Sequence, residues 1–262
     1  MFNIPPKIFI YNGTRTNNID MGEIASYLKK KIKTADVELR KDFIEHHIPI
    51  PVQKKTDRFC ERLAGIRIKD VKVRTRFPAL PVEIEYEKRR ITDPHCKSFG
   101  VLYDGFELSG IFSEFIPKNE HRFCHIAFTN QLLCTWDEKD KRYHLRTSIY
   151  GFPSLISTPG VIEAPARPRE FYVKQGLGVD ILDLKREFKG RFLDYDDKRL
   201  TEIMKGFIIQ SLFYHVTGEP FCENTDCRLY NAHWQEELIR TQTKGEFCRR
   251  HKKTSSVKAS PP

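Results

Sequence analysis

The sequence contains no long hydrophobic run, and no stretch approaches the roughly 18 consecutive apolar residues of a membrane-spanning helix. Its opening residues, MFNIPPKIFIYNGTRTN, also lack the basic and then apolar composition of a signal peptide. Neither export nor membrane insertion is therefore expected. We predict a cytoplasmic protein without a membrane partner.

A disulfide framework is not expected either, because the seven cysteines are odd in number and four of them lie singly along the chain. The four that lie singly in apolar or mixed segments, and that we expect to be small buried side chains, are Cys60, Cys96, Cys124 and Cys134. Cys222, Cys227 and Cys248 remain as a separate group near the C-terminus.

A glycine-rich phosphate-binding loop is absent from the opening segment. Residues 7–11 (KIFIY) predict a strand, residues 20–32 (DMGEIASYLKKKI) an amphipathic helix, and residues 37–40 (VELR) a second strand. Together they predict a β-α-β unit. The connection NGTRTNN holds a single glycine among polar residues, so this pattern argues against a nucleotide site.

The middle of the chain shows helix and then strand patterns. Residues 55–65 predict a helix, and strands are expected from Phe99 onward, with a hairpin across the polar turn at 137–142. Residues 151–168 (GFPSLISTPGVIEAPARP) are rich in proline and glycine, and we expect an ordered surface loop there. These patterns predict an α+β fold with an α/β-like opening, in which helices pack on a twisted mixed sheet.

The clearest helix pattern covers residues 195–217. Aspartates at 194, 196 and 197 are expected to cap its start, and Gly218 to end it in the left-handed conformation. Apolar residues recur at steps of three and four from Leu200 to Leu212, which predicts one face packed on the core. His215 falls close to this stripe. We expect it to point inward or into a cleft, either as a hydrogen-bonded core residue or as a ligand.

Paired metal-ligand residues follow this helix. The spacing is Cys222-x4-Cys227, then twenty residues, then Cys248-x2-His251. Zinc takes four tetrahedral ligands, and thiolates with imidazole satisfy it in a structural site. We therefore predict one structural Zn²⁺ held by Cys222, Cys227, Cys248 and His251. His233 is an alternative fourth ligand, and the alternative to any metal site is a set of unrelated cysteines with a tail histidine.

The C-terminal quarter resembles the archaemetzincins, a family of zinc metallopeptidases with the pattern HExxHxxGxxHC, a further x4-C-x-M and a later CxxC. The positions that agree are His215, Gly218, Cys222, Cys227 and Cys248, with His251 in place of the final cysteine. This resemblance covers about residues 200–251. It implies a metzincin-like fold, and it implies that the cysteine set is the structural zinc site of that family.

Three positions depart from the peptidase pattern. Ser211 stands at the first histidine, Leu212 at the general-base glutamate and Phe221 at the third histidine. In such a peptidase three histidines hold the catalytic zinc, and the glutamate takes a proton from the metal-bound water. Only His215 of those four groups is present, so the resemblance implies a degenerate site in which a second, catalytic zinc is not expected.

The leading hypothesis is therefore an archaemetzincin-like pseudoenzyme that keeps the structural zinc and binds a peptide or protein along the former substrate cleft. One alternative is a zinc-dependent peptidase or hydrolase with a rearranged site around His215. Its other candidate groups are His121, His125, His144 and Glu219. A second alternative is a nucleic-acid-binding protein, since the net charge is +10.

Three segments are predicted along the chain. Residues 1–217 form a metzincin-like core that contains the β-α-β unit and the helix at 195–217. Residues 218–251 form the zinc-binding segment. Residues 252–262 form a basic, disordered tail.

Overall fold

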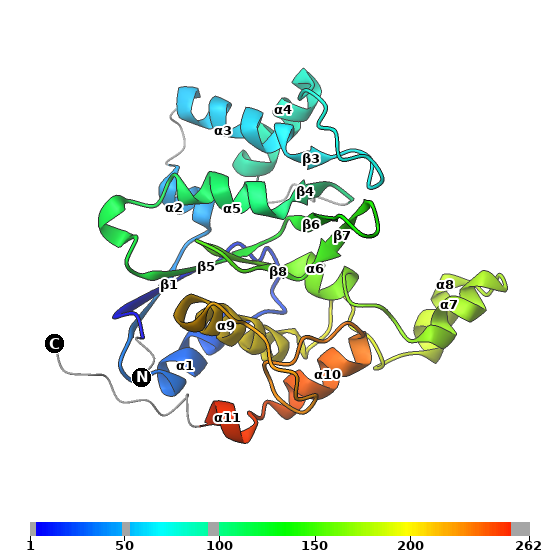
Figure 1. Ribbon diagram of the computed structural model, residues 1–262. Helices are drawn as coiled ribbons and strands as arrows, with labels where there is room; N and C mark the ends of the chain where they lie inside the picture. Colours follow the sequence, from blue (N-terminus) through cyan, green and yellow to red (C-terminus); the bar gives the residue numbers. More distant parts are fainter. Residues whose placement is uncertain (1–3, 49–52, 94–99, 253–262) are drawn as a thin grey trace. The chain divides into compact units, whose positions relative to one another are not determined.

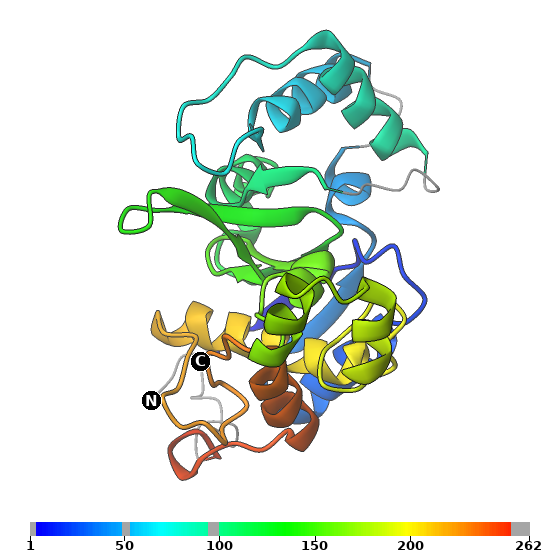
Figure 2. The same ribbon diagram turned by 90° about the vertical axis from the view of Figure 1, so that its right-hand side faces the viewer.

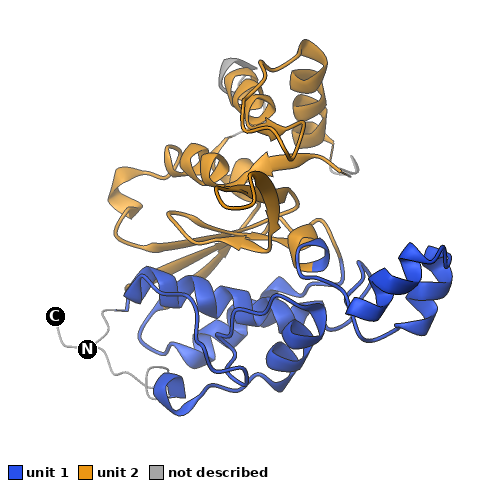
Figure 3. Ribbon diagram, turned by 45° about the vertical axis from the view of Figure 1, so that its right-hand side comes forward, with its two compact units in different colours: residues 1–4, 17–35, 162–262 blue, residues 5–16, 36–161 orange. Residues whose placement is uncertain are grey.

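The computed structural model describes residues 4–48, 53–93 and 100–252. Its elements form two compact units, each assembled from separate stretches of the chain (Figure 3). Unit 1 comprises residues 1–4, 17–35 and 162–262, and unit 2 comprises residues 5–16 and 36–161. Cys96 and the predicted tail beyond residue 252 lie outside the described residues.

Unit 2 contains a five-stranded sheet (Figure 1). Its order is β2 (Asp36–Arg40), β1 (Lys7–Tyr11), β5 (Cys124–Thr129), β9 (Ser154–Ser157) and β8 (Ser148–Ile149). The pairs β1–β2, β1–β5 and β5–β9 are parallel, and β8 is antiparallel to β9. Every residue of β5 and β9 is buried, as is typical of inner strands in a parallel sheet.

A second sheet in unit 2 has four strands. Its order is β3 (Arg67–Ile68), β4 (Leu102–Asp104), β6 (Leu132–Asp137) and β7 (Arg142–Arg146). The hairpin predicted at 137–142 is confirmed by the antiparallel strands β6 and β7, drawn in green in Figure 2. Asp137 lies opposite Arg142. The helical elements of unit 2 include α2 (Phe43–His47), α3 (Gln53–Gly65), α4 (Pro81–Thr92), α5 (Gly105–Ser113), the 3₁₀ turn η1 (Lys118–Glu120) and most of α6 (Thr158–Glu163).

The core of unit 2 joins strand and helix side chains into one apolar cluster. Phe43 of α2 and Phe112 of α5 stack with ring centroids 4.1 Å apart. Cys60, Cys124 and Cys134 are buried, as predicted, and burial raises the pKa of each thiol to about 12. These three thiols are therefore protonated, inert core groups at neutral pH.

The predicted surface loop at 151–168 is wrong, because this segment contains β9 and α6. Residues Ser154–Ser157 lie between β5 and β8 and are fully buried. The hydroxyl of Ser157 donates to the carbonyl oxygen of Gln131 at 2.6 Å, which offsets the cost of burying a polar group. Proline and glycine on either side of a short, serine-containing strand concealed it in the sequence.

Unit 1 is built from helices. They include α1 (Met21–Lys31), α7 (Arg169–Gly176), α8 (Ile181–Glu187), α9 (Leu200–Thr217), α10 (Gln235–Lys244) and α11 (Arg249–Lys252). Both α1 and α10 pack against α9, which is buried almost all round rather than along a single stripe. An added Cβ at Gly206 would lie 1.8 Å from Oε1 of Gln242, so this glycine allows α10 to approach α9 closely.

The two ends of α9 differ in how well the sequence predicts them. Gly218 ends the helix with φ of 76°, as predicted. The start lies at Leu200 rather than at residue 195, and the aspartates do not cap it. Arg199 occupies the N-cap position, and the carboxylate of Asp197 accepts a hydrogen bond from the Arg199 backbone N–H at 2.9 Å. That contact closes a turn ahead of the helix.

The predicted α+β class with mixed sheets is confirmed, and so is the opening strand–helix–strand order with parallel β1 and β2. α9 and the segment 218–252 belong to the same compact unit, whereas the sequence had suggested a boundary between them at residue 217. None of the helices in the described ranges combines the length and the apolar character needed to cross a bilayer.

Candidate metal centre

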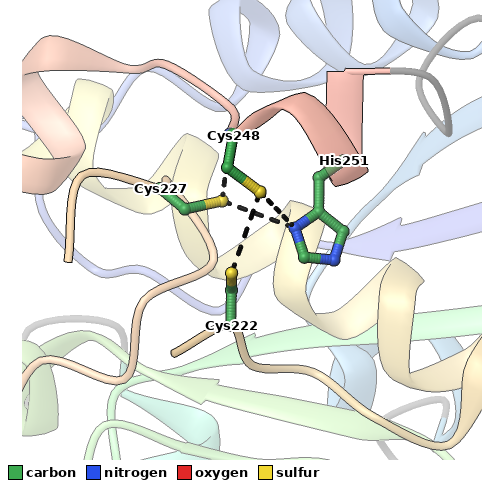
Figure 4. Close-up of side chains that lie close together, drawn as sticks. All are labelled: Cys222, Cys227, Cys248 and His251. Carbon is green, nitrogen blue, oxygen red and sulfur yellow. Dashed lines mark hydrogen bonds between the residues drawn. The ribbon is translucent and has the colours of Figure 1, made fainter. Parts of the chain in front are cut away.

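Four side chains converge in unit 1 near the end of the described chain (Figure 4). The Sγ atoms of Cys222 and Cys248 lie 3.9 Å apart. Nδ1 of His251 lies 3.2 Å from Sγ of Cys248 and 3.6 Å from Sγ of Cys227. All four ligand atoms lie within 4.8 Å of one another, and among the described residues this is the His, Cys, Asp or Glu group placed to hold a metal ion.

These separations fit a tetrahedral zinc ion. Zn–S bonds of about 2.3 Å and a Zn–N bond of about 2.0 Å place tetrahedral ligand atoms roughly 3.5 to 3.8 Å apart. The Cys227–His251 distance of 3.6 Å lies in that range, the sulfur–sulfur distance of 3.9 Å is slightly longer, and the Cys248–His251 distance of 3.2 Å is slightly shorter. Three thiolates and an imidazole also favour zinc over hard cations such as Mg²⁺ or Ca²⁺, which prefer oxygen.

The first ligand pair is held by the loop between Cys222 and Cys227. The backbone N–H of Cys222 donates to the carbonyl oxygen of Leu229 at 2.9 Å, and the N–H of Cys227 donates to that of Asn224 at 2.9 Å. These two bonds fold the intervening residues outward and turn both sulfur atoms to the same side. Cys227 and Leu229 are completely buried, which fixes the inner end of the loop.

The second ligand pair lies at the start of α11. Cys248 directly precedes this helix, and the backbone N–H of His251 donates to the Cys248 carbonyl oxygen at 3.0 Å. The His251 side chain is 7% exposed, and its ring meets the ring of Phe213 edge to face, with centroids 5.3 Å apart. The predicted alternative, His233, is exposed before α10 and lies outside the cluster.

Backbone amides point at the sulfur atoms. The N–H of Asn224 donates to Sγ of Cys222 at 3.4 Å, and the N–H of Cys248 donates to Sγ of Cys227 at 3.5 Å. Such bonds favour the thiolate that a metal requires. Burial raises the pKa of the Cys227 thiol to about 12. Burial also acts to raise the pKa of the Cys248 thiol. Hydrogen bonds from backbone N–H groups, chiefly that of His251, outweigh burial and lower this pKa below its ordinary value.

Arg228, between Cys227 and Leu229, connects the loop at residues 222–229, here called the metal loop, to the rest of unit 1. Its side chain is 2% exposed. The guanidinium donates to the carbonyl oxygen of Glu202 at 2.7 Å, to the Glu202 carboxylate at 2.6 Å and to the Tyr27 hydroxyl at 3.1 Å. The loop is thereby bonded to α9 and lies next to α1. No sequence pattern indicated this role, since an arginine beside a cysteine is not a motif.

The ion pair of Arg228 continues into a small network. Lys205 of α9 donates to Glu202 at 2.6 Å and to Glu23 of α1 at 2.7 Å. Although burial raises the pKa of Glu202, hydrogen bonds from Lys205 and Arg228 lower it overall. The carboxylate is therefore ionised at neutral pH, and charge-assisted hydrogen bonds hold α1, α9 and the metal loop together.

The predicted inward orientation of His215 is wrong. This residue lies in the last turn of α9, where its side chain is exposed. Neighbouring atoms still crowd the ring enough for desolvation to lower its pKa. The apolar pattern that placed His215 on a buried stripe holds only as far as Leu212, because the last turn of the helix emerges from the core.

The residues that the resemblance places at the other peptidase positions lie outside the ligand cluster. Ser211 is completely buried, and its hydroxyl donates to the carbonyl oxygen of Phe207 at 3.0 Å, one turn earlier in α9. Leu212 is 3% exposed and packs in the core. Phe221 is exposed, with 39% of its surface accessible. The hydroxyl of Ser211 is thus satisfied within its own helix.

The histidines proposed for a rearranged site have separate partners in unit 2. The contacts are His121 Nε2 to the Ile116 carbonyl oxygen at 3.0 Å, His125 Nδ1 to the Tyr11 hydroxyl at 3.0 Å, and His144 to the Asp140 carboxylate at 2.8 Å. Glu219 is exposed just after α9. The described residues therefore form no second ligand group from this set.

Sequence reasoning missed a polar network around Tyr11. Because Nε2 of His125 faces the carbonyl oxygen of Glu120 at 3.1 Å, it carries the proton, and Nδ1 accepts from the Tyr11 hydroxyl. The Tyr11 oxygen in turn accepts from Arg40 and from Nε2 of His47, each at 3.1 Å. Burial raises the pKa of Tyr11 to about 12. The histidine pair in FIEHH was the available signal.

A family model described as "Probable metallopeptidase family (DUF6775)" matches residues 5–257 of the chain. The chain belongs to this family. The metallopeptidase resemblance seen in the sequence is thereby confirmed, and the metal centre described above lies inside the matched region. That description is compatible with a metal ion at the cluster of three cysteines and one histidine.

One solved structure is similar to this member of the metallopeptidase family. It is an archaemetzincin from Methanopyrus kandleri, with 13% sequence identity, a TM-score of 0.40, and coverage of 95% of this chain and 92% of the archaemetzincin chain. No curated protein matches the sequence.

Proposed function

We propose that this member of the metallopeptidase family holds one structural zinc ion at Cys222, Cys227, Cys248 and His251 and has no catalytic zinc at α9. The observation that carries the first part is the convergence of three sulfur atoms and one imidazole nitrogen within 4.8 Å. The zinc would supply stability, by joining the loop at Cys227 to α11, and all four of its coordination positions would be filled by protein.

The loss of a catalytic centre is supported by the chemistry of three side chains. At the positions of a peptidase motif, Ser211 and Leu212 are buried and Phe221 has no donor atom. A general base that could accept a proton from metal-bound water is missing from this helix turn. The resulting protein would be a pseudoenzyme whose remaining role is recognition.

We propose that the recognised partner is an extended peptide or protein segment. A strand at the edge of a sheet can pair with such a segment through its main chain, without any catalysis. The five-stranded sheet ends in β2 on one side, and this five-residue strand exposes 42% of Leu39. β2 is therefore the better candidate edge, since β8 at the other side has two residues.

Metal content tests the zinc proposal. Protein purified without a chelator should contain one zinc per chain, and His215→Ala should leave that content unchanged. Two zinc ions per chain, one of them removed by His215→Ala, would contradict the loss of the catalytic centre and restore the hydrolase alternative. A mixture of fluorogenic peptides should remain uncleaved under the same conditions.

Peptide binding is tested by hydrogen exchange. A mixture of random extended peptides should slow exchange at the amides of residues 36–40, while the amides of β5, an inner strand of the same sheet, serve as the control. Equal exchange at 36–40 with and without peptide would argue against β2 as the binding edge, whatever the zinc content.

A further inference from the structure

α7 and α8 form a helical hairpin with a core of its own. Phe171 and Leu184 are completely buried, and with Phe188 and Phe192 they make an apolar cluster separate from the other cores. The turn between the helices is fixed, since the N–H of Val179 donates to the carbonyl oxygen of Lys174 at 3.1 Å. In Figures 1 and 3 the hairpin extends from one end of unit 1, away from α1, α9 and α10.

The end of this hairpin exposes an unusual density of large apolar side chains. Fourteen large hydrophobic residues are exposed in the described ranges, and six of them fall within residues 172–182. They are Tyr172 (47%), Val173 (62%), Leu177 (78%), Val179 (38%), Ile181 (39%) and Leu182 (60%). Scattered exposed apolar residues are normal, whereas a concentration like this one marks an interaction surface.

Charges beside this surface follow a self-complementary pattern along α8. Asp183 lies in the first turn, and Lys185 and Arg186 lie in the last turn. Leu182 and Arg186 are four residues apart, so they share the exposed face of the helix with Asp183. When two copies of α8 are laid antiparallel, the acidic first turn of each meets the basic last turn of the other, and the two helix dipoles oppose.

We propose that the hairpin end, residues 172–186, is the interface of a two-fold homodimer, and that its occupant is the same surface of a second copy. Leu177 and Leu182 would lie at the centre of this interface, and Asp183 of each chain would face Arg186 of the other. A two-fold axis makes the contact isologous, so one patch must complement itself in both shape and charge.

The carboxylates of the hairpin end disfavour a lipid surface as the occupant. Asp180 caps α8 by accepting a hydrogen bond from the N–H of Leu182 at 2.7 Å, and Asp183 follows three residues later, next to the exposed Ile181 and Leu182. Insertion of Leu177 and Leu182 into a bilayer would carry both carboxylates into the headgroup and acyl boundary, where burial of a charge is costly. In a dimer the same carboxylates meet guanidinium or ammonium groups.

The first test is the molar mass of the full chain in solution, measured by sedimentation equilibrium over a wide range of concentration. The native chain should dimerise reversibly, and Leu182→Glu should raise the dissociation constant by about tenfold or more. Val82→Glu, at a residue 70% exposed in unit 2, is the matched control and should leave the dissociation constant unchanged. A native chain that is monomeric throughout would overturn the proposal.

Charge reversal gives a sharper test. Asp183→Arg and Arg186→Asp should each weaken self-association by repulsion between like charges across the axis. An equimolar mixture of the two variants should associate more tightly than either alone, because both cross-axis pairs then become opposite in charge. Within one chain Asp183 and Arg186 already form an ion pair at 3.1 Å. If the two residues acted only within their own helix, mixing the variants would not restore association. A mixture that stays monomeric would therefore overturn the proposed interface.

Other occupants remain distinguishable. Flotation with vesicles that contain anionic lipid should leave the native chain in solution, and vesicle binding that Leu182→Glu abolishes would overturn the dimer in favour of a membrane surface. Circular dichroism and zinc content of each variant should equal those of the native chain. A variant that fails this check would be replaced by Leu182→Gln, for which the same weakening is expected.

Discussion

Sγ of Cys248 and Nδ1 of His251 lie 3.2 Å apart at the start of α11, because one backbone hydrogen bond of 3.0 Å closes the turn between the two residues. Both donor atoms can therefore reach one ion without rearranging the backbone. The partner pair, Cys222 and Cys227, comes from a loop about twenty residues earlier in the sequence. A metal at this point would link two segments that α10 separates in the sequence.

Removal of one buried ligand should destabilise unit 1. We expect Cys227→Ala to abolish zinc binding and to lower the melting temperature by roughly 10 °C, since a ligand present at a thousand times its dissociation constant contributes about 4 kcal/mol. Cys124→Ala is the matched control, because Cys124 is equally buried but lies in β5. Zinc content by mass spectrometry and melting by calorimetry check both variants, and equal melting temperatures would contradict a structural metal.

The fourth ligand can be identified by a pair of histidine variants. His251→Ala should lower zinc affinity by at least tenfold, whereas His233→Ala should leave it unchanged, because His233 lies outside the cluster. His251→Cys should retain zinc, since a thiolate can replace the imidazole. Competition with a chromogenic chelator measures all three affinities, and a large loss in His233→Ala would reverse the assignment.

The buried arginine beside Cys227 should matter more than its tyrosine partner. Arg228→Met leaves the carboxylate of Glu202 without its guanidinium, and we expect a cost of about 2 to 3 kcal/mol, limited because Glu202 is 37% exposed. Tyr27→Phe removes a single hydrogen bond to Arg228 and should cost about 1 kcal/mol. Denaturant unfolding of the zinc-bound protein measures both, and the reverse order would show that Arg228 does not anchor the loop.

The sequence predicted those parts of the molecule that follow from local periodicity and spacing. The opening strand, helix and parallel strand, the β6–β7 hairpin and the left-handed end of α9 at Gly218 all depend on nearby residues, and all were predicted. The clustering of Cys222, Cys227, Cys248 and His251 was predicted in the same way, because short gaps within each pair restrict where the side chains can lie.

Features set by distant packing were not predictable. β9 is a strand because β5 and β8 lie on either side of it, while its own sequence, SLIS between proline and glycine, has little strand character. His215 was assigned to a buried stripe, but burial along α9 depends on which neighbours cover each turn. The anchoring contacts of Arg228 join it to Tyr27, 201 positions away, and to Glu202, 26 positions away, and no local pattern encodes them.

Acidification should destabilise unit 2 through His47. Burial, then the nearby His46 and Arg40, lowers the pKa of His47 from 6.5 to about 4, although Glu120 acts in the opposite direction. The unfolded chain therefore binds a proton at a higher pH than the folded chain does. The resulting stability is fully present above pH 6.5 and is lost as the pH falls towards 4, by about 1 to 3 kcal/mol.

His47→Gln isolates this effect. Glutamine keeps an N–H that can donate to the Tyr11 hydroxyl but does not titrate, so the free energy of unfolding should change less between pH 7 and pH 5 than it does in the native chain. An unaltered slope in His47→Gln would assign the acid sensitivity to other groups, of which His46 is the nearest with a lowered pKa.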